Sequence, residues 1–262
     1  VENADYFKVD LGLQSDYIAP DKFFIFGGSK TTTNLDFTYL NYKLYALSPA
    51  PKRDFAKINF TIKSDGNFEG FDFSTGGNAY WVAQTGAGEK VTENLFAGFL
   101  DIKAKYLDNK TFGGRIDVNL RQFRGRTINF YEILGYSNFI YLGLDFKPAI
   151  GFQFANASNN QNRIGLLLNL QAQKIINKDF SLQLFFTNRL KNQSFAYYYE
   201  RNPYLVDSLE IDYGNETLIG GTIRFEPTKD LNLVGGTNFA YTVRRPCFEN
   251  TSLGYFNILY LD

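Results

Sequence analysis

Apolar and polar side chains alternate residue by residue along most of this chain. The stretch 113–123, GGRIDVNLRQF, is the clearest example, because every second side chain from Ile116 to Leu120 is apolar. A β-strand sends neighbouring side chains to opposite faces of its sheet. The pattern therefore predicts a strand with Ile116, Val118 and Leu120 on one face and charged or amide side chains on the other.

Similar alternating segments recur from one end of the chain to the other, separated by turn residues. They include residues 56–63, 100–106, 140–146, 164–172 and 180–187, with later strands expected at 218–226, 231–243 and 254–261. Many of these segments are longer than the roughly 5–6 residues that are typical of strands in globular proteins. We count about 12–16 strand candidates, of a length that crosses a bilayer when the strands are tilted.

The chain reads as one domain over residues 1–262, because no Pro-, Gly- or Ser-rich linker and no shift in composition divides it. Turns are expected at Asp65-Gly66 and at Lys147-Pro148, where the residue types favour a change of direction. Alternation is weakest at 64–95 and at 190–216. We therefore expect both regions to be long loops or plug segments.

The alternation has two meanings, depending on whether the apolar face meets a protein core or lipid. Aromatic residues make up 18% of the chain, with 27 Phe and 18 Tyr, and many lie near the ends of the expected strands. Membrane barrels place aromatic girdles there, although a soluble β core also uses such rings. We predict an all-β protein, a closed antiparallel up-and-down transmembrane β-barrel of about 12–14 strands. A secreted soluble β-sandwich that binds a ligand is the alternative fold.

Composition excludes several classes of function. The 27 basic residues equal the 27 acidic residues, which gives no reason to expect nucleic acid as a partner. The chain has no histidine, so histidine-dependent triads and the commonest metal ligand are absent. We predict no enzymatic activity, no metal and no cofactor. Asp101 and Asp117 are the remaining candidate acid–base pair, but Lys103, Lys105 and Arg115 nearby favour an ion-pair network.

The long, aromatic-ended strands resemble those of the bacterial outer-membrane β-barrel class over almost the whole chain. Near the C-terminus Phe256, Ile258 and Tyr260 alternate as in the last strand of many members, although Leu261 and Asp262 follow. The abundance of Asn, Lys, Phe and Tyr is similar to barrels of the Bacteroidota. The resemblance implies a location in the bacterial outer membrane. Its implied partners are membrane lipid, lipopolysaccharide and other outer-membrane protein subunits.

A barrel of this class places its apolar faces against lipid and its polar faces in the lumen. The side chains expected to face lipid are Ile116, Val118, Leu120, Leu142, Leu144, Leu166, Leu168, Leu182 and Leu184. Those expected to line the lumen are Asp101, Lys103, Lys105, Arg115, Asp117, Asn119, Arg121, Asp145 and Arg189. Because basic residues outnumber acidic ones in this second set, we expect a mildly basic lumen that favours anions.

The function favoured by this pattern is a porin-like channel for small solutes. A second interpretation is a non-catalytic accessory barrel in a larger outer-membrane complex for secretion, gliding or nutrient uptake. A third is a transporter of apolar molecules. A barrel of about 12–14 strands has a narrow lumen that side chains or loops can fill, which suits the accessory role.

Overall fold

The computed structural model describes most of the chain. The described residues are 6–18, 29–43, 52–68, 70–86, 89–106, 110–157, 161–191, 193–201, 205, 210–250 and 256–261. They form strands almost throughout, with one short helix. No helix among them is long and apolar enough to span a membrane.

Twelve strands form one antiparallel sheet, in which each strand pairs with the next along the chain. The first six are β1 (Tyr6–Ile18), β2 (Ser29–Lys43), β3 (Lys52–Phe68), β4 (Phe71–Gly86), β5 (Glu89–Lys105) and β6 (Lys110–Phe123). The next six are β7 (Arg126–Tyr141), β8 (Leu144–Asn156), β9 (Asn162–Asn177), β10 (Phe180–Leu190), β11 (Asn215–Thr228) and β12 (Leu231–Val243). The other elements are α1 (Phe195–Arg201) and a separate hairpin of β13 (Arg245–Asn250) and β14 (Phe256–Leu261).

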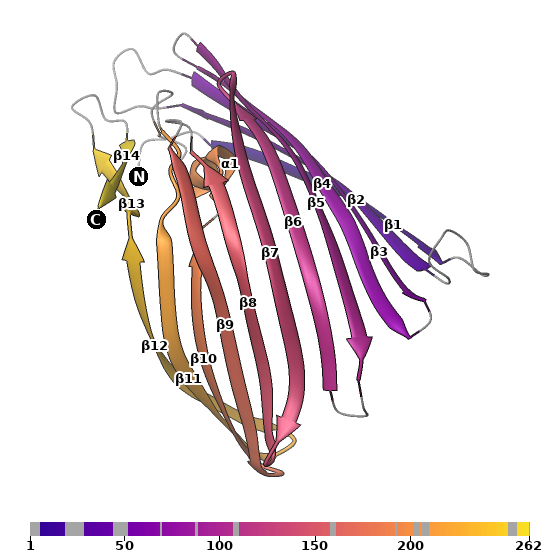
Figure 1. Cartoon of the computed structure of the whole chain (residues 1–262). Helices are drawn as coiled ribbons and strands as arrows, with labels where there is room; N and C mark the ends of the chain where they lie inside the picture. The colour runs from indigo at the N-terminus through magenta and orange to yellow at the C-terminus, as the bar shows by residue number, and fades with distance from the viewer. Residues whose placement is uncertain are drawn as a thin grey trace.

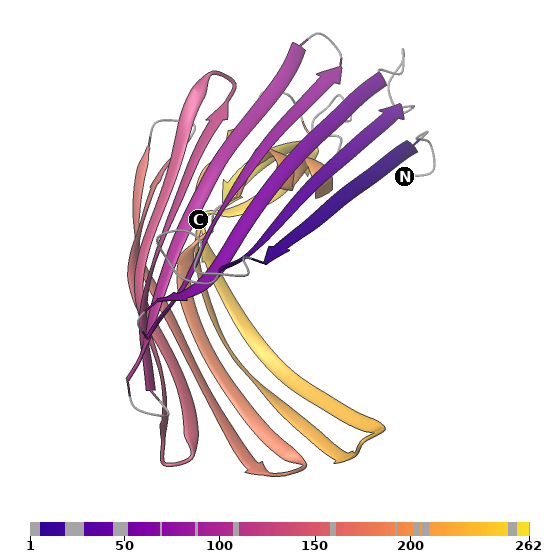
Figure 2. The same ribbon diagram turned by 90° about the vertical axis from the view of Figure 1, so that its right-hand side faces the viewer.

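The sheet is curved and open. β1 and β12 are its two edges, and no pairing joins them within the described part of the chain. Figure 2 shows the sheet as a trough whose edge strands diverge. The predicted up-and-down antiparallel topology is confirmed, whereas the predicted closure into a barrel is wrong for these twelve strands.

The two faces of the sheet have opposite polarity. Leu100, Ile116 and Ile133 lie directly opposite one another on β5, β6 and β7, with exposed fractions of 42%, 47% and 55%. Phe123, on the other face of β6, packs on Phe195 of α1 with ring centroids 5.1 Å apart. Because the sheet curves around α1 (Figure 2), the face that carries α1 is concave and the apolar, exposed face is convex.

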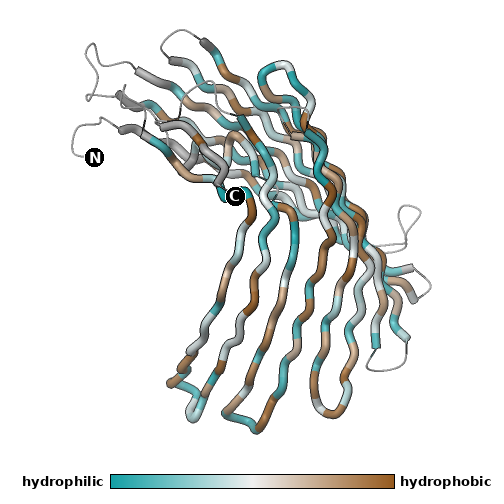
Figure 3. The backbone as a smooth tube through the Cα atoms, turned by 60° about the vertical axis from the view of Figure 1, so that its left-hand side comes forward, coloured by the Kyte–Doolittle hydropathy of each residue, from teal (hydrophilic) through white to brown (hydrophobic). Residues whose placement is uncertain are grey.

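This arrangement is the reverse of a soluble β-sandwich, in which the apolar face of one sheet is covered by a second sheet. Here β1 to β12 form a single layer, and large apolar side chains stay exposed along the convex face of nearly every one of these strands. Hydropathy coloured along the backbone alternates between apolar and polar residues within the strands (Figure 3). The soluble sandwich considered from sequence therefore does not describe this fold.

The described residues of 64–95 form strands rather than a loop or plug, apart from the turn residue Gly70. They comprise the end of β3, the whole of β4 and the beginning of β5, and β4 pairs with both neighbours along its length. Asp65 and Gly66, expected as a turn, lie inside β3 opposite Lys30 and Ser29. Gly, Ser, Thr and Asn make up seven of the 16 residues of β4 and weaken its apolar signal, but backbone pairing does not depend on side-chain hydropathy.

A turn splits the segment 140–146, which we expected as one strand. Leu142 and Gly143 connect β7 to β8, and both have positive φ, +49° and +72°. This conformation matches the two-residue turns that join twisted antiparallel strands. Leu142 therefore lies outside the strands and has no place on the convex face. The expected turn at Lys147-Pro148 is also wrong, because β8 runs through it.

Glycines on the concave face make room for aromatic rings on the neighbouring strand. Gly113 lies directly opposite Tyr136 and Gly76 directly opposite Phe99. A β-carbon on either glycine would come closer than 3.0 Å to the ring of its partner. The two rings therefore lie directly over these glycines, on the surface of the neighbouring strand.

Replacing Gly113 with alanine is expected to destabilise the sheet by about 1–3 kcal/mol through overpacking. The Tyr136 ring is held by the hydrogen bond that its hydroxyl donates to Asp101, so it cannot move away freely. Urea unfolding, followed by the gel migration of folded and unfolded protein, measures the loss. Gly98→Ala is the control, because its new β-carbon would meet only the Gly76 carbonyl oxygen, at 3.6 Å. Equal stability of the two variants would contradict this packing account.

Candidate functional site

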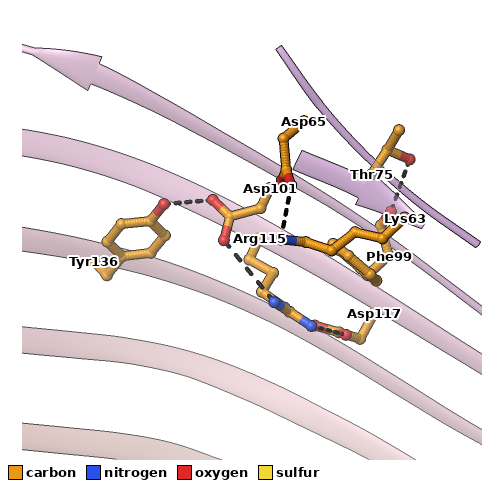
Figure 4. A network of polar contacts seen from close by, with 8 residues as sticks. All are labelled: Lys63, Asp65, Thr75, Phe99, Asp101, Arg115, Asp117 and Tyr136. Atoms are coloured by element: carbon orange, nitrogen blue, oxygen red, sulfur yellow. Dashed lines mark hydrogen bonds and ion pairs between the residues drawn. The ribbon is translucent and has the colours of Figure 1, made fainter. Parts of the chain in front are cut away.

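The concave face carries a network of charged side chains around Arg115 (Figure 4). The guanidinium of Arg115 donates to both carboxylate oxygens of Asp117, with two N···O distances of 2.7 Å. It also lies 4.0 Å from Asp101 and stacks over the Phe99 ring at 4.5 Å. Asp101 accepts a hydrogen bond from the Tyr136 hydroxyl. Both carboxylates are thus held by partners, an arrangement that suits an ion-pair network better than proton transfer.

The same kind of pairing recurs across the concave face. Charges two residues apart on one strand pair in Lys63–Asp65 and Asp145–Lys147, both at 2.9 Å. Charges on neighbouring strands pair in Lys103–Asp72, at 3.5 Å. Exposed ion pairs contribute little to stability, about 0–1 kcal/mol each. Their effect here is on the charge of the concave face. Asp65 and Asp72 are not in the expected lumen set, and their negative charges offset part of the basic surplus of that set.

Strand register places all nine expected lumen residues on the concave face. Asp101, Lys103, Arg115 and Arg189 line one groove there, of about 530 Å³. Asp117 and Asn119 line a second groove, of about 550 Å³. Lys105 and Asp145 lie near the strand ends opposite Thr111 and Ile140, and Arg121 is buried beneath α1 and the residues just before it.

Eight of the nine side chains expected to face lipid lie on the convex face by register. They are Ile116, Val118, Leu120, Leu144, Leu166, Leu168, Leu182 and Leu184. Leu142 is the exception, because it lies in the turn between β7 and β8. Contact of the eight with lipid stays a prediction.

The described residues of the connection between β10 and β11, namely 191, 193–201, 205 and 210–214, lie over the concave face near one end of the strands (Figures 1 and 2). Three ring pairs join it to the sheet: Phe195 to Phe123, Tyr199 to Phe55 and Tyr213 to Phe130, at centroid distances of 5.1, 5.7 and 5.8 Å. All six rings are at most 5% exposed. This connection therefore forms a small hydrophobic core with the inner wall, and we call it the docked segment.

A buried ion pair fixes the docked segment to the wall. Glu93 is fully buried and Arg121 is 4% exposed, and Arg121 Nε lies 3.2 Å from Glu93 Oε1. Glu93 accepts hydrogen bonds from the backbone N–H groups of Phe195 and Ala196, at 3.1 and 3.0 Å. Arg121 donates to the carbonyl oxygen of Gln193, at 2.7 Å. The two charges thus hold both sides of the turn that leads into α1.

Three further polar contacts tie the docked segment at its end and immediately before its beginning. Gln153 accepts a hydrogen bond from the Leu190 backbone N–H, at 2.6 Å. Asp212 is 3% exposed and pairs with Arg163 at 3.2 Å and with Arg244 at 2.9 Å. The segment is therefore anchored at its beginning, at α1 and at its end.

Sequence reasoning missed Glu93, Gln153 and Asp212 as anchoring residues. Glu93 lies in the region interpreted as a loop, and Asp212 lies in the other expected loop. The available signal was Glu93 between Val91 and Leu95, a lone acid in a row of apolar side chains on one face. Such a residue is buried only where a partner neutralises it. Among the described residues, no group of three or more Cys, Asp and Glu side chains is arranged to hold a metal ion.

Comparison of sequences gives no relative: no protein-family model and no curated protein matches this chain. Comparison of structures does. The siderophore receptor PirA from Pseudomonas aeruginosa superposes with a TM-score of 0.61 at 10% identity, over 97% of this chain and 50% of that one. The fold is that of an outer-membrane β-barrel wall. The FrpB iron transporter from Neisseria meningitidis gives a TM-score of 0.60 at 7% identity, over 99% and 53%.

This chain spans about half the length of the two solved structures that it matches. At identities of 10% and 7%, the likeness concerns the fold alone. The half-length match agrees with the open sheet, in which the twelve strands do not close into a barrel of their own.

Proposed function

We propose that this chain forms about half of the wall of a large outer-membrane barrel for solute uptake, with its concave face lining the lumen. The observation that carries this proposal is the inverted polarity of an open sheet: apolar side chains are exposed on the convex face, and ion pairs and amides cover the concave face. In this role the chain catalyses no reaction. Its convex face contacts membrane lipid and lipopolysaccharide.

Closure of the barrel requires strands beyond the twelve. β1 and β12 each present an unpaired edge, and unsatisfied backbone groups in the hydrocarbon layer cost several kcal/mol each. A partner that completes the wall removes both edges at once. The half-length match to receptor chains supports a barrel of about 22 strands, the size class of plugged outer-membrane transporters.

A porin-like channel is the second candidate, and the two grooves across the concave face favour it. Because most charges of that face are paired, we expect weak ion selectivity with a small preference for anions. Reversal potentials in planar bilayers under a salt gradient measure this preference. Strong cation selectivity would contradict it.

The wall proposal is tested first by location and by folded state. The protein expressed in a Gram-negative host is expected in the outer-membrane fraction, extracted only by detergent, and to migrate on a gel differently before and after boiling. Its apolar convex face requires detergent or lipid, because contact between such a large apolar surface and water is unfavourable. Recovery of folded monomer from the soluble fraction without detergent would overturn the proposal. Steady conductance separates the porin-like channel from a barrel closed by a plug.

A further inference from the structure

Of the two grooves on the concave face, the one of about 530 Å³ has unequal numbers of basic and acidic side chains in its lining. This groove crosses β5 to β10, and it is lined by four basic side chains, Lys103, Arg115, Lys147 and Arg189, against two acidic ones, Asp101 and Glu132. The second groove, on β2 to β6, has two basic and two acidic side chains, Lys30, Lys63, Asp65 and Asp117. The lining of the first groove therefore has a surplus of basic side chains that the lining of the second lacks.

Arg189 is the source of this surplus. The other three basic side chains of the groove pair with a carboxylate: Lys103 with Asp72, Arg115 with Asp117 and Lys147 with Asp145. Arg189 is exposed, and Glu216, which lies opposite it on β11, pairs instead with Lys191. Within the part of the chain that the structure describes, Arg189 forms no ion pair within 4.0 Å. Its guanidinium is thus available to a ligand.

The two acidic side chains of the groove are already engaged. Asp101 accepts the Tyr136 hydroxyl and lies 4.0 Å from Arg115. Glu132 accepts a hydrogen bond from Gln153, at 2.6 Å. Neither is in ion-pair contact with Arg189, although Glu132 lies near enough to interact with it electrostatically. A ligand that binds Arg189 therefore displaces no existing ion pair.

The surroundings of Arg189 distinguish an organic anion from an inorganic one. The apolar side chains that line the same groove as Arg189 include Leu134, Pro148, Ala149 and Leu167. Leu167 is next in β9 to Leu168, which pairs with Asn188 of β10. A guanidinium donates two parallel hydrogen bonds to a carboxylate, which fixes the direction of the acid. Apolar side chains beside it gain contact with a hydrocarbon chain, whereas chloride offers them nothing.

We propose that Arg189 binds the carboxylate of small organic acids in the lumen, with their hydrocarbon chain against Leu134 and Leu167. This inference rests on the proposed function, because it requires the concave face to meet an aqueous lumen. It adds to that function a substrate class, short-chain carboxylates, and a residue that selects them. The second groove takes no such ligand, because Lys63 pairs with Asp65 and Lys30 lies 3.8 Å from Asp16.

The test is a saturation-transfer NMR titration of the detergent-extracted full chain with butyrate and with acetate, each in a chloride buffer. Butyrate is expected to bind more tightly than acetate, because its longer chain adds apolar contact. Arg189→Gln is expected to weaken butyrate binding by about tenfold or more, because it removes the hydrogen bonds between the guanidinium and the carboxylate. Arg189→Lys keeps the charge, loses the paired geometry, and should give an intermediate affinity.

Lys63→Gln in the second groove is the matched control, because it removes one exposed positive charge from the same face and should leave butyrate binding unchanged. Heat-modifiable gel migration checks that each variant is folded. Equal butyrate binding by wild type and Arg189→Gln, or an equal loss in Lys63→Gln, would overturn the inference. If either result is obtained with a protein that is located in the outer membrane, the carboxylate site is contradicted and the proposed function is not. A folded protein absent from that membrane contradicts the proposed function itself.

Discussion

Replacing Arg121 with leucine is expected to lower the free energy of unfolding by about 3–5 kcal/mol. The substitution leaves Glu93 fully buried without its cation, although two backbone N–H groups and the Tyr80 hydroxyl still donate to it. An uncompensated buried carboxylate favours any state in which water reaches it. We therefore expect the docked segment to leave the wall before the strands separate.

Two measurements follow this change in Arg121→Leu. Urea unfolding of the detergent-solubilised protein reports the total loss, and limited proteolysis reports release of residues 191–214. Lys147→Gln is the control, because it breaks a pair whose side chains are 46% and 32% exposed and should cost no more than about 1 kcal/mol. Adding Glu93→Gln to Arg121→Leu removes the stranded charge and should restore part of the stability. Wild-type protease resistance in Arg121→Leu would show that the pair does not hold the segment.

Replacing Val118 with arginine is expected to impair assembly by about 2–4 kcal/mol if the side chain meets lipid near the bilayer midplane. Val118 lies on the convex face of β6, directly between Gly98 and Tyr131 on the neighbouring strands. No acidic side chain is opposite it to compensate an added charge. The amount of heat-modifiable protein in the outer membrane, and urea unfolding in lipid vesicles, measure the effect.

Asn119→Arg is the companion of Val118→Arg on the same strand. Asn119 lines the second groove of the concave face, where Lys63, Asp65 and Asp117 already lie. An added charge at that position stays in water, so assembly should be nearly unchanged and conductance, where present, should shift towards anions. Tolerance of Val118→Arg together with failure of Asn119→Arg would mean that β6 has its faces the other way round, as in a soluble core.

The faces of individual strands were predictable because the alternation is local. In β6 the apolar side chains predicted from residues 115–121 to share one face lie on the convex face. The polar side chains predicted to share the other face lie on the concave face. The errors fall where the local signal is weak or misleading. β4 is rich in Gly, Ser, Thr and Asn, so its alternation is faint. At 140–146 the alternation continues across Leu142 and Gly143, and hydropathy alone does not reveal the turn.

The candidate site was predictable as a set of residues but not as a set of contacts. All nine expected lumen side chains lie on the concave face, yet the register decides which carboxylate meets which cation. Arg115 faces Asp101 across β5 and β6 and still pairs more closely with Asp117 on its own strand. Arg189 is left without an ion pair for the same reason, since Glu216, opposite it on β11, pairs with Lys191, and Glu132 is hydrogen-bonded to Gln153.

What the sequence by itself determined is the all-β class, the up-and-down order and the polarity of most strand faces, because a period of two residues is written into each strand. What only the tertiary structure decided is the curvature of the sheet, its failure to close over twelve strands and the contact between the docked segment and the inner wall. These depend on partners far apart in the chain: Glu93 meets Phe195 across 102 positions, and Arg121 meets Gln193 across 72. No local pattern encodes such a pairing, because its energy comes from burying the two charges together.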